Sequence, residues 1–181
     1  MSKYLEWAGR EPSATRLVMT LAVAGVVFLA GLPLLIAVGS GWLDEAFGLP
    51  RFDASLVGRV AGIVLIVAGG PFAFWAVLAE ARIGSGTPLP MIPTQRLVVV
   101  PPFTYCRNPM VLGTVLAYLG LGVLLGSISA ITLALVFAAL LLLYVKLLEE
   151  DELEARFGAD YVAYKQTTPF LVPRPPRRSR A

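Results

Sequence analysis

Long apolar stretches alternate with short polar segments along the chain, and they predict its helices. The first two stretches run from Leu17 to Val38 and from Leu56 to Leu78. Each holds about the 20 residues that a helix rising about 1.5 Å per residue needs to cross about 30 Å of hydrocarbon. The third, Met110 to Leu148, is charged only at Lys146 and is interrupted at Gly126 and two nearby serines. Its length predicts a hairpin of two helices, which gives about four transmembrane helices.

A long polar segment, "EARIGSGTPLPMIPTQRLVVVPP", joins the second stretch to the third. Its prolines and glycines predict a loop, and loops longer than about 12–15 residues tend to be functional or disordered. The apolar, β-like run Leu97 to Val100 argues against disorder. A fifth, re-entrant segment between Pro88 and Pro102 remains an alternative.

The chain beyond the hairpin is rich in charge and predicts helix outside the membrane. The helix is expected to continue to about Phe157, break at Gly158 and resume as a short amphipathic helix before Pro169. Tyr161 and Tyr164 share one face of that helix, which suits the membrane interface.

These elements predict an all-α integral membrane protein made of three regions. Residues 1–79 form a membrane anchor with two transmembrane helices, and the first apolar run is longer than the core of a signal peptide. Residues 80–173 carry the unusual polar chemistry and the hairpin. Residues 174–181 form a basic, proline-rich tail that suits anionic lipid headgroups better than nucleic acid.

Composition supports the membrane assignment: 57% of the residues are hydrophobic, 15% are charged, and the mean hydropathy is +0.75. With four spans, both termini lie on one side, and every basic residue except Arg51 and Arg59 falls on that side. The positive-inside rule then places the termini and the long loop in the cytoplasm. We expect the membrane to be the cytoplasmic membrane of a bacterium or an archaeon.

The chain contains one cysteine, Cys106, and no histidine. A Cys/His zinc site is therefore excluded within one chain, as is catalysis by a histidine base. We expect no metal, and the oligomeric state remains open.

The stretch "FTYCRNPMVLG" places three polar or rigid residues directly before an apolar helix. Asn108 followed by Pro109 is a good helix start, so helix capping alone accounts for part of this stretch. Arg107 beside the helix N-terminus would also form an anion site for a carboxylate or a phosphate.

Glu149 and Glu150 stand at the other end of the hairpin. They mark where a helix leaves lipid, and solvated charges at such an end are ordinary. The hairpin nevertheless folds back on itself, so we expect them near Arg107 and Asn108. An anion receptor facing a cation receptor suits a zwitterion, such as the amino-acid end of a cofactor.

The segments "RLVVVPPFTYCRNPMVLG" and "EEDELEARFGADYVAYKQTTPFLVP" resemble the C-terminal half of the isoprenylcysteine carboxyl methyltransferase family and its phospholipid methyltransferase relatives. Those families carry an Arg-[His/Asn]-Pro turn, a Glu-Glu pair and a Phe-Gly-x-x-Tyr-x-x-Tyr helix. The resemblance covers residues 84–173 and implies an S-adenosylmethionine-dependent methyltransferase. It also implies that the acceptor is a lipophilic small molecule or a lipid.

By resemblance, the cofactor lies between the cytoplasmic loop and the helix after the hairpin, and Glu149 meets its ammonium group. Arg107 and Glu150 are the expected catalytic residues. The expected cofactor-binding residues are Leu97, Val98, Phe103, Tyr105, Arg107, Asn108, Pro109, Met110 and Glu149.

The sequence departs from the family pattern at three positions. Pro101 replaces a glycine, Thr104 often aligns with a basic residue, and Val111 replaces a tyrosine. The loss of that tyrosine affects the acceptor's identity more than the cofactor's.

Several functions stay open. Isoprenylcysteine-type carboxyl O-methylation needs no base, because a carboxylate acceptor is already ionised. N-methylation of a phosphatidylethanolamine-type headgroup, an NADPH-dependent sterol-reductase-like enzyme and a non-catalytic membrane binding protein are the alternatives.

Overall fold

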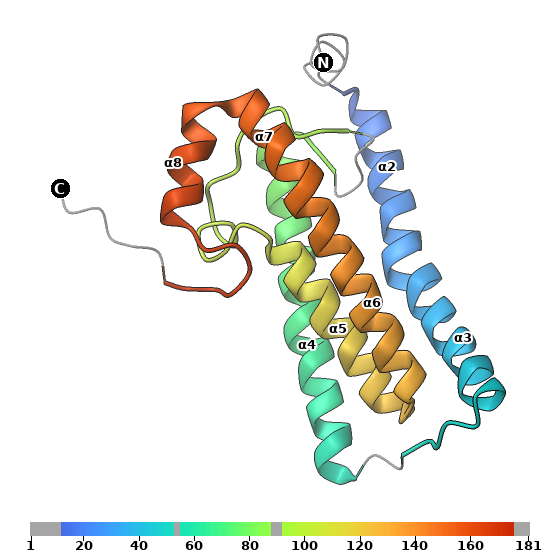
Figure 1. Ribbon diagram of the computed structural model, residues 1–181. Coiled ribbons are helices and arrows are strands. Elements are labelled where there is room, and N and C mark those ends of the chain that lie inside the picture. Colours follow the sequence, from blue (N-terminus) through green and yellow to red (C-terminus); the bar gives the residue numbers. More distant parts are fainter. Residues whose placement is uncertain (1–11, 53–54, 88–91, 176–181) are drawn as a thin grey trace. The chain divides into compact units, whose positions relative to one another are not determined.

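The computed structural model describes residues 12–52, 55–87 and 92–175, and the regular secondary structure in these ranges is entirely helical (Figure 1). The first residues of the predicted anchor, residues 88–91 of the possible re-entrant segment and residues 176–181 of the predicted basic tail lie outside the described residues. Contacts divide the chain into two compact units, which are described in turn.

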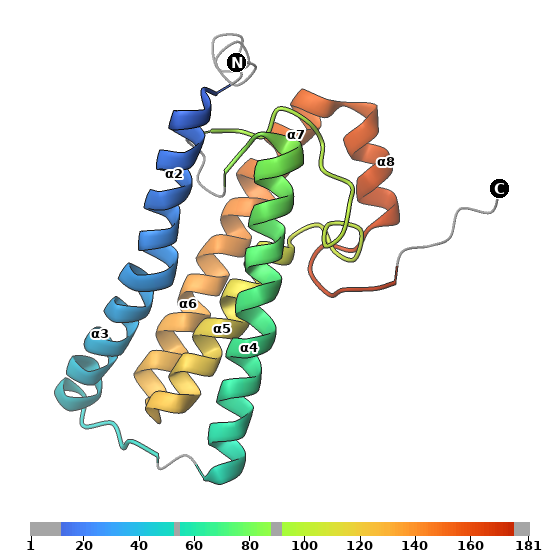
Figure 2. The same cartoon turned by 180° about the vertical axis from the view of Figure 1, so that it is seen from behind.

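One unit consists of residues 25–73 and 111–143. It contains α3 (Leu32–Ala46), most of α4 (Leu56–Ala79), α5 (Pro109–Leu125) and α6 (Ile128–Tyr144). The predicted hairpin is confirmed: Figures 1 and 2 show α5 and α6 side by side, and the turn between them contains Gly126 at a φ of +59°. Glycine suits this turn, since a Cβ at Gly126 would clash with the carbonyl oxygen of Phe52.

Small residues let the helices of this unit approach closely. Ala130 and Ala134 of α6 are fully buried in a cluster with Ile36 and Tyr118. Gly69 of α4 lies directly against the backbone of α5 at Gly113. Without a hydrophobic driving force in lipid, such close backbone packing is a main source of helix association.

Asp44 joins the end of α3 to the start of α6. Its carboxylate accepts a hydrogen bond from the Ser127 hydroxyl at 2.6 Å and another from the Ser129 backbone N–H at 3.2 Å. Arg51 lies 3.7 Å away, and the Asp44 side chain is buried. The carboxylate therefore satisfies free donors at the N-terminus of α6, where negative charge is favoured.

The other unit consists of the remaining residues, which include 74–87, 92–110 and 144–175 of the described part. The π-helical turn η2 (Glu80–Gly84) ends α4, and η3 (Val145–Glu149) joins α6 to α7 (Glu150–Phe157). The chain breaks at Gly158, at a φ of +54°, and resumes as α8 (Ala159–Thr167). This break and restart confirm the sequence prediction.

The first membrane helix passes through both units. It comprises α2 (Ala14–Val26), the π-helical turn η1 (Val27–Gly31) and α3. Pro33, the second residue of α3, has no N–H to donate to the preceding turn, which accounts for the irregular hydrogen bonding there.

Within the part of the chain that the structure describes, three helices are long and apolar enough to cross a membrane: Ala14–Ala46, Leu56–Gly84 and Ile128–Phe157. The apolar helix Pro109–Leu125 is shorter. Many large apolar side chains are exposed on these helices, among them Leu29, Leu56 and Val57 at 77%, 78% and 78%. Such surfaces are stable against lipid, and the protein is an all-α integral membrane protein, as predicted.

Candidate functional site

The turn that precedes α5 is held by the segment that follows α8. The Arg107 backbone N–H donates to the Pro169 carbonyl at 2.9 Å. The Asn108 side-chain amide donates to the Phe170 carbonyl, also at 2.9 Å. Pro109 is the first residue of α5, as predicted, and its side chain is fully buried. Distant parts of the sequence thus fix the conformation of this turn.

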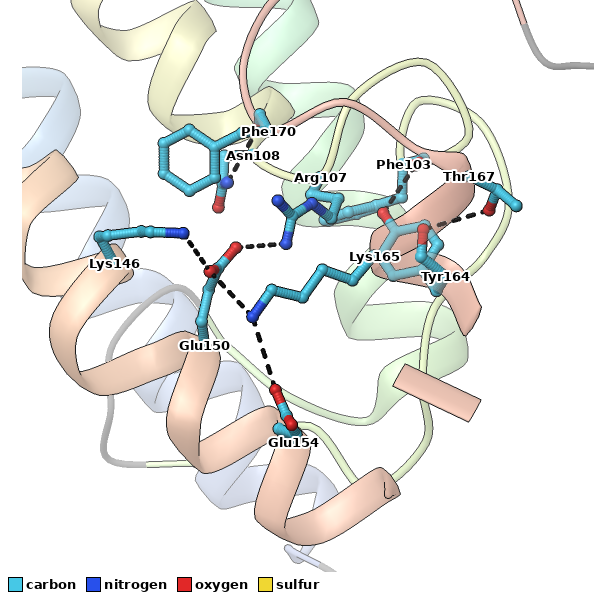
Figure 3. A network of polar contacts seen from close by, with 10 residues as sticks. All are labelled: Phe103, Arg107, Asn108, Lys146, Glu150, Glu154, Tyr164, Lys165, Thr167 and Phe170. Carbon is cyan, nitrogen blue, oxygen red and sulfur yellow. Dashed lines mark hydrogen bonds and ion pairs between the residues drawn. The ribbon is translucent and has the colours of Figure 1, made fainter. Parts of the chain in front are cut away.

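Arg107 and Glu150 meet inside the protein, which confirms that the two ends of the hairpin lie together (Figure 3). The Arg107 guanidinium donates from Nη1 to Glu150 Oε1. The two side chains are only 9% and 3% exposed. The pair is direct, so each residue neutralises most of the other's charge.

Two lysines complete the surroundings of Glu150. Lys146 Nζ lies 2.9 Å and Lys165 Nζ lies 3.4 Å from Glu150 Oε2. Lys165 also lies 3.5 Å from Glu154 Oε2. Figure 3 shows these cations converging on Glu150 from α8, η3 and the turn. One buried carboxylate therefore orders three separate segments.

The Phe170 ring covers the same cluster. The Arg107 Cζ and Lys146 Nζ atoms lie 5.4 Å and 5.5 Å from the ring centroid. Both distances fall within the about 6 Å range of favourable cation–π contact. The aromatic ring also keeps water away from the ion pair, which strengthens the Coulomb attraction.

Glu149 occupies a different environment from its neighbour Glu150. It is half-buried and lies within electrostatic reach of Glu80, from η2. The Glu80 Oε2 atom is buried and has no hydrogen-bond partner among the described residues. Two adjacent carboxylates in such a place either share a proton or hold a cation between them. Glu80 and Glu149 together can therefore receive an ammonium or sulfonium group.

The long loop has a fixed structure in its described part. Val98 is buried against Gly84, whose added Cβ would lie 2.9 Å from Val98 Cγ2. Gly86 packs as closely against Thr94, and Arg156 of α7 donates to the Thr94 carbonyl. The "GSG" motif therefore allows close packing of the loop, and Leu97 lies half-buried beside Val98.

Phe103 and Tyr105 lie on the same turn with different partners. The Phe103 carbonyl accepts a hydrogen bond from the Tyr164 hydroxyl at 2.7 Å. The Tyr105 ring contacts Trp75 of α4 edge to face, with centroids 6.3 Å apart. Met110 follows in the first turn of α5 and is half-buried.

Tyr161 and Tyr164 were expected to suit the membrane interface, but their side chains face the interior of the protein and not lipid. Both side chains are buried inside the protein, at 2% and 7% exposure, with ring centroids 6.2 Å apart. Burial raises the pKa of Tyr161 to about 12 and also raises the pKa of Tyr164. Both hydroxyls therefore stay protonated at neutral pH and act as hydrogen-bonding groups.

A pocket of about 270 Å³ opens beside Arg107. Its lining comes from the turn and from the end of α8 with the segment after it: Thr104, Arg107, Lys165, Gln166, Thr167, Thr168, Pro169, Phe170, Arg174 and Pro175. Arg107 is the one predicted site residue in this lining.

Sequence reasoning missed several residues that the fold brings to Glu149 and Glu150. Lys146 could have been found, because it precedes Glu150 by four residues on a helix. Glu80, Lys165 and Phe170 carried no local signal, since only the folded chain brings them close to the Glu-Glu pair.

Comparison with known proteins gives one family match. A family model described as phospholipid methyltransferase matches residues 57–160. The match includes Glu80, Arg107 and the Glu-Glu pair, and it ends before Lys165 and Phe170. Searches of curated proteins and of solved structures returned no match.

Proposed function

The chain belongs to the phospholipid methyltransferase family, and from this premise we propose that it is an S-adenosylmethionine-dependent methyltransferase embedded in the membrane and acting on a lipophilic acceptor. The observation that carries the proposal is the contact between Arg107 and Glu150. This contact brings together the turn before α5 and the Glu-Glu pair, which both lie in the region that the family model matches.

The residues near this contact fit the proposed cofactor. Glu149 and the unpartnered Glu80 carboxylate suit its cationic amino-acid end. Leu97, Val98, Phe103 and Tyr105 offer apolar and aromatic surface for the rest, and Arg107 to Met110 form the turn beside it. Arg107 and Glu150 hold that turn against α7.

S-adenosylmethionine supplies an activated methyl group that is transferred by in-line displacement. The protein's task is then to align donor and acceptor in a dry site, which contributes about 7–11 kcal/mol without an acid or a base. The covered Arg107–Glu150 pair and the packed loop serve this role by excluding water and fixing the turn.

Two acceptor chemistries fit this arrangement. A carboxylate, as in an isoprenylcysteine-type compound, needs no base. A headgroup amine must lose a proton, which an acidic side chain, a tyrosine or water would have to accept. The second acceptor, a phosphatidylethanolamine-type lipid, is favoured by the family's description.

Calorimetric binding of S-adenosylmethionine to the detergent-purified full chain tests the cofactor. We expect binding that is at least about tenfold weaker in Glu149→Gln, because a charge-assisted contact to the ammonium group is lost. Glu45→Gln is the matched control, since Glu45 is an exposed glutamate at the end of α3. Binding of NADPH without binding of S-adenosylmethionine would contradict the proposal.

The acceptor is then identified by transfer of labelled methyl groups. N-acetyl-farnesylcysteine and phosphatidylethanolamine are offered separately with labelled S-adenosylmethionine. Label in only one product assigns the acceptor class. Tight cofactor binding with no transfer to any lipid would favour the non-catalytic binding protein.

A further inference from the structure

The pocket beside Arg107 has a basic lining. Arg107, Lys165 and Arg174 line it, and none of its described lining residues is acidic. The other lining residues are threonines, a glutamine, prolines and Phe170. Apart from Arg107, none of them belongs to the residues proposed above for the cofactor, so this pocket raises a separate question.

Two polar atoms of the lining residues are left without a partner. Thr104 Oγ1 and Arg107 Nε are both buried and make no hydrogen bond to a described residue. Arg107 is only 9% exposed, and its Nη1 is already held by Glu150. An arginine Nε can only donate and a threonine hydroxyl can donate or accept, so the group that satisfies both must be an acceptor.

Positive charge is in excess around the pocket. Arg107, Lys146 and Lys165 surround Glu150, and Glu154 is the one further carboxylate paired with this group in the described chain. Arg174 adds a cation that makes no ion pair with a described residue, and its backbone N–H is anchored to the Tyr105 carbonyl at 2.9 Å. The missing acceptor is therefore an anion.

We propose that this pocket binds a phosphate group, carried by a phospholipid headgroup or by a soluble phosphate. Four of the residues that line the pocket carry hydrogen-bond donors: Thr104, Arg107, Lys165 and Arg174. A tetrahedral phosphate presents enough oxygens to accept from all of them, whereas a carboxylate has two. The site does not depend on methyl transfer.

Ligand-dependent thermal unfolding of the detergent-purified full chain tests the proposal. One arm adds inorganic phosphate, and a second compares short-chain phosphatidylglycerol with the matching diacylglycerol, which lacks the phosphate. Stabilisation by inorganic phosphate assigns a soluble source. Stabilisation by phosphatidylglycerol alone, without an effect of diacylglycerol, assigns a lipid source.

Three variants locate the effect. Thr104→Val removes an unpartnered hydroxyl, so the ligand-free protein should remain as stable while the ligand binds about tenfold more weakly. Arg174→Gln should also weaken binding about tenfold, because it removes a charge-assisted contact. Arg16→Gln removes the same charge from an exposed helix residue and should leave binding unchanged.

Other results would overturn the proposal. One such result is that neither phosphate compound raises the unfolding temperature. Another is that phosphate stabilises wild type, Thr104→Val and Arg174→Gln equally. Displacement of phosphate by S-adenosylmethionine would also overturn it, since the pocket would then hold the cofactor's carboxylate. If Glu149→Gln no longer binds the cofactor but still binds phosphate, the two ligands occupy separate sites, as proposed.

Discussion

Arg107 and Glu150, 43 positions apart in the chain, form an ion pair from which water is almost wholly excluded. Burying two charges is costly, so the pair contributes to stability only while both members are present. The partners are unequal, because Glu150 also pairs with Lys146 and Lys165, while Glu150 is the one carboxylate of the described residues that pairs with the Arg107 guanidinium. This asymmetry makes the two single substitutions distinguishable.

We predict that Glu150→Gln destabilises the protein more than Arg107→Met does. The first change leaves Arg107 buried without a counter-charge, which costs about 3–5 kcal/mol. The second leaves Glu150 with two lysines. Reversible denaturant unfolding in detergent measures both, with Glu154→Gln as a control at a half-exposed site that should cost less than about 1 kcal/mol. Equal effects of Glu150→Gln and Glu154→Gln would refute the buried ion pair.

Local patterns in the sequence were sufficient to place most helices. Hydropathy located the start of α4 at Leu56, and Gly158 marked the break between α7 and α8. The same reasoning ended the first apolar stretch at Val38, before Ser40 and Asp44. The helix continues to Ala46 since both polar side chains are buried, and Asp44 finds its partners 83 and 85 positions later.

The candidate site was only partly predictable for the same reason. The hairpin required Arg107 and Glu150 to be near each other, because a tight turn returns the chain to its starting level. Nothing local pointed to Glu80 or Phe170, whose roles depend on how the loop and the segment after α8 fold. The tyrosines of α8 were misassigned, because spacing shows that two residues share a face but not whether that face meets lipid or protein.

We predict that Asp44 is a structural carboxylate while its neighbour Glu45 is not. Asp44→Asn removes the charge that accepts from Ser127 and from the start of α6, and should lower the unfolding free energy by about 1–3 kcal/mol. Glu45→Gln changes an exposed side chain and should stay within about 0.5 kcal/mol. Thermal unfolding of the two variants in the same detergent makes the comparison. Similar losses in both would mean that the cap does not form.

We predict that the native protein resists alkylation at its single cysteine. Cys106 has 0% exposure, and burial raises the pKa of its thiol to about 11. Because the thiolate is the reactive form, labelling with iodoacetamide should be very slow at about pH 8 and should accelerate as the pH rises toward that pKa. Denatured protein should react readily, and Cys106→Ala should not react at all. Rapid labelling of the folded protein near neutral pH would show that the turn opens to water.

We predict opposite effects of the same substitution at two adjacent glycines of α4. A Cβ at Gly69 would lie 2.8 Å from the Ala117 backbone nitrogen and would press on the Gly113 carbonyl, whereas a Cβ at Gly70 meets nothing within 4 Å. Gly69→Ala should therefore force α4 and α5 apart and cost about 1–3 kcal/mol, as overpacking does. Gly70→Ala gains helix propensity without a clash and should be neutral or stabilising by up to about 1 kcal/mol. Unfolding midpoints of both variants, measured side by side, test this difference directly. If both variants were equally stable, α4 and α5 would not approach each other as closely at Gly69 and Gly113 as the structure shows.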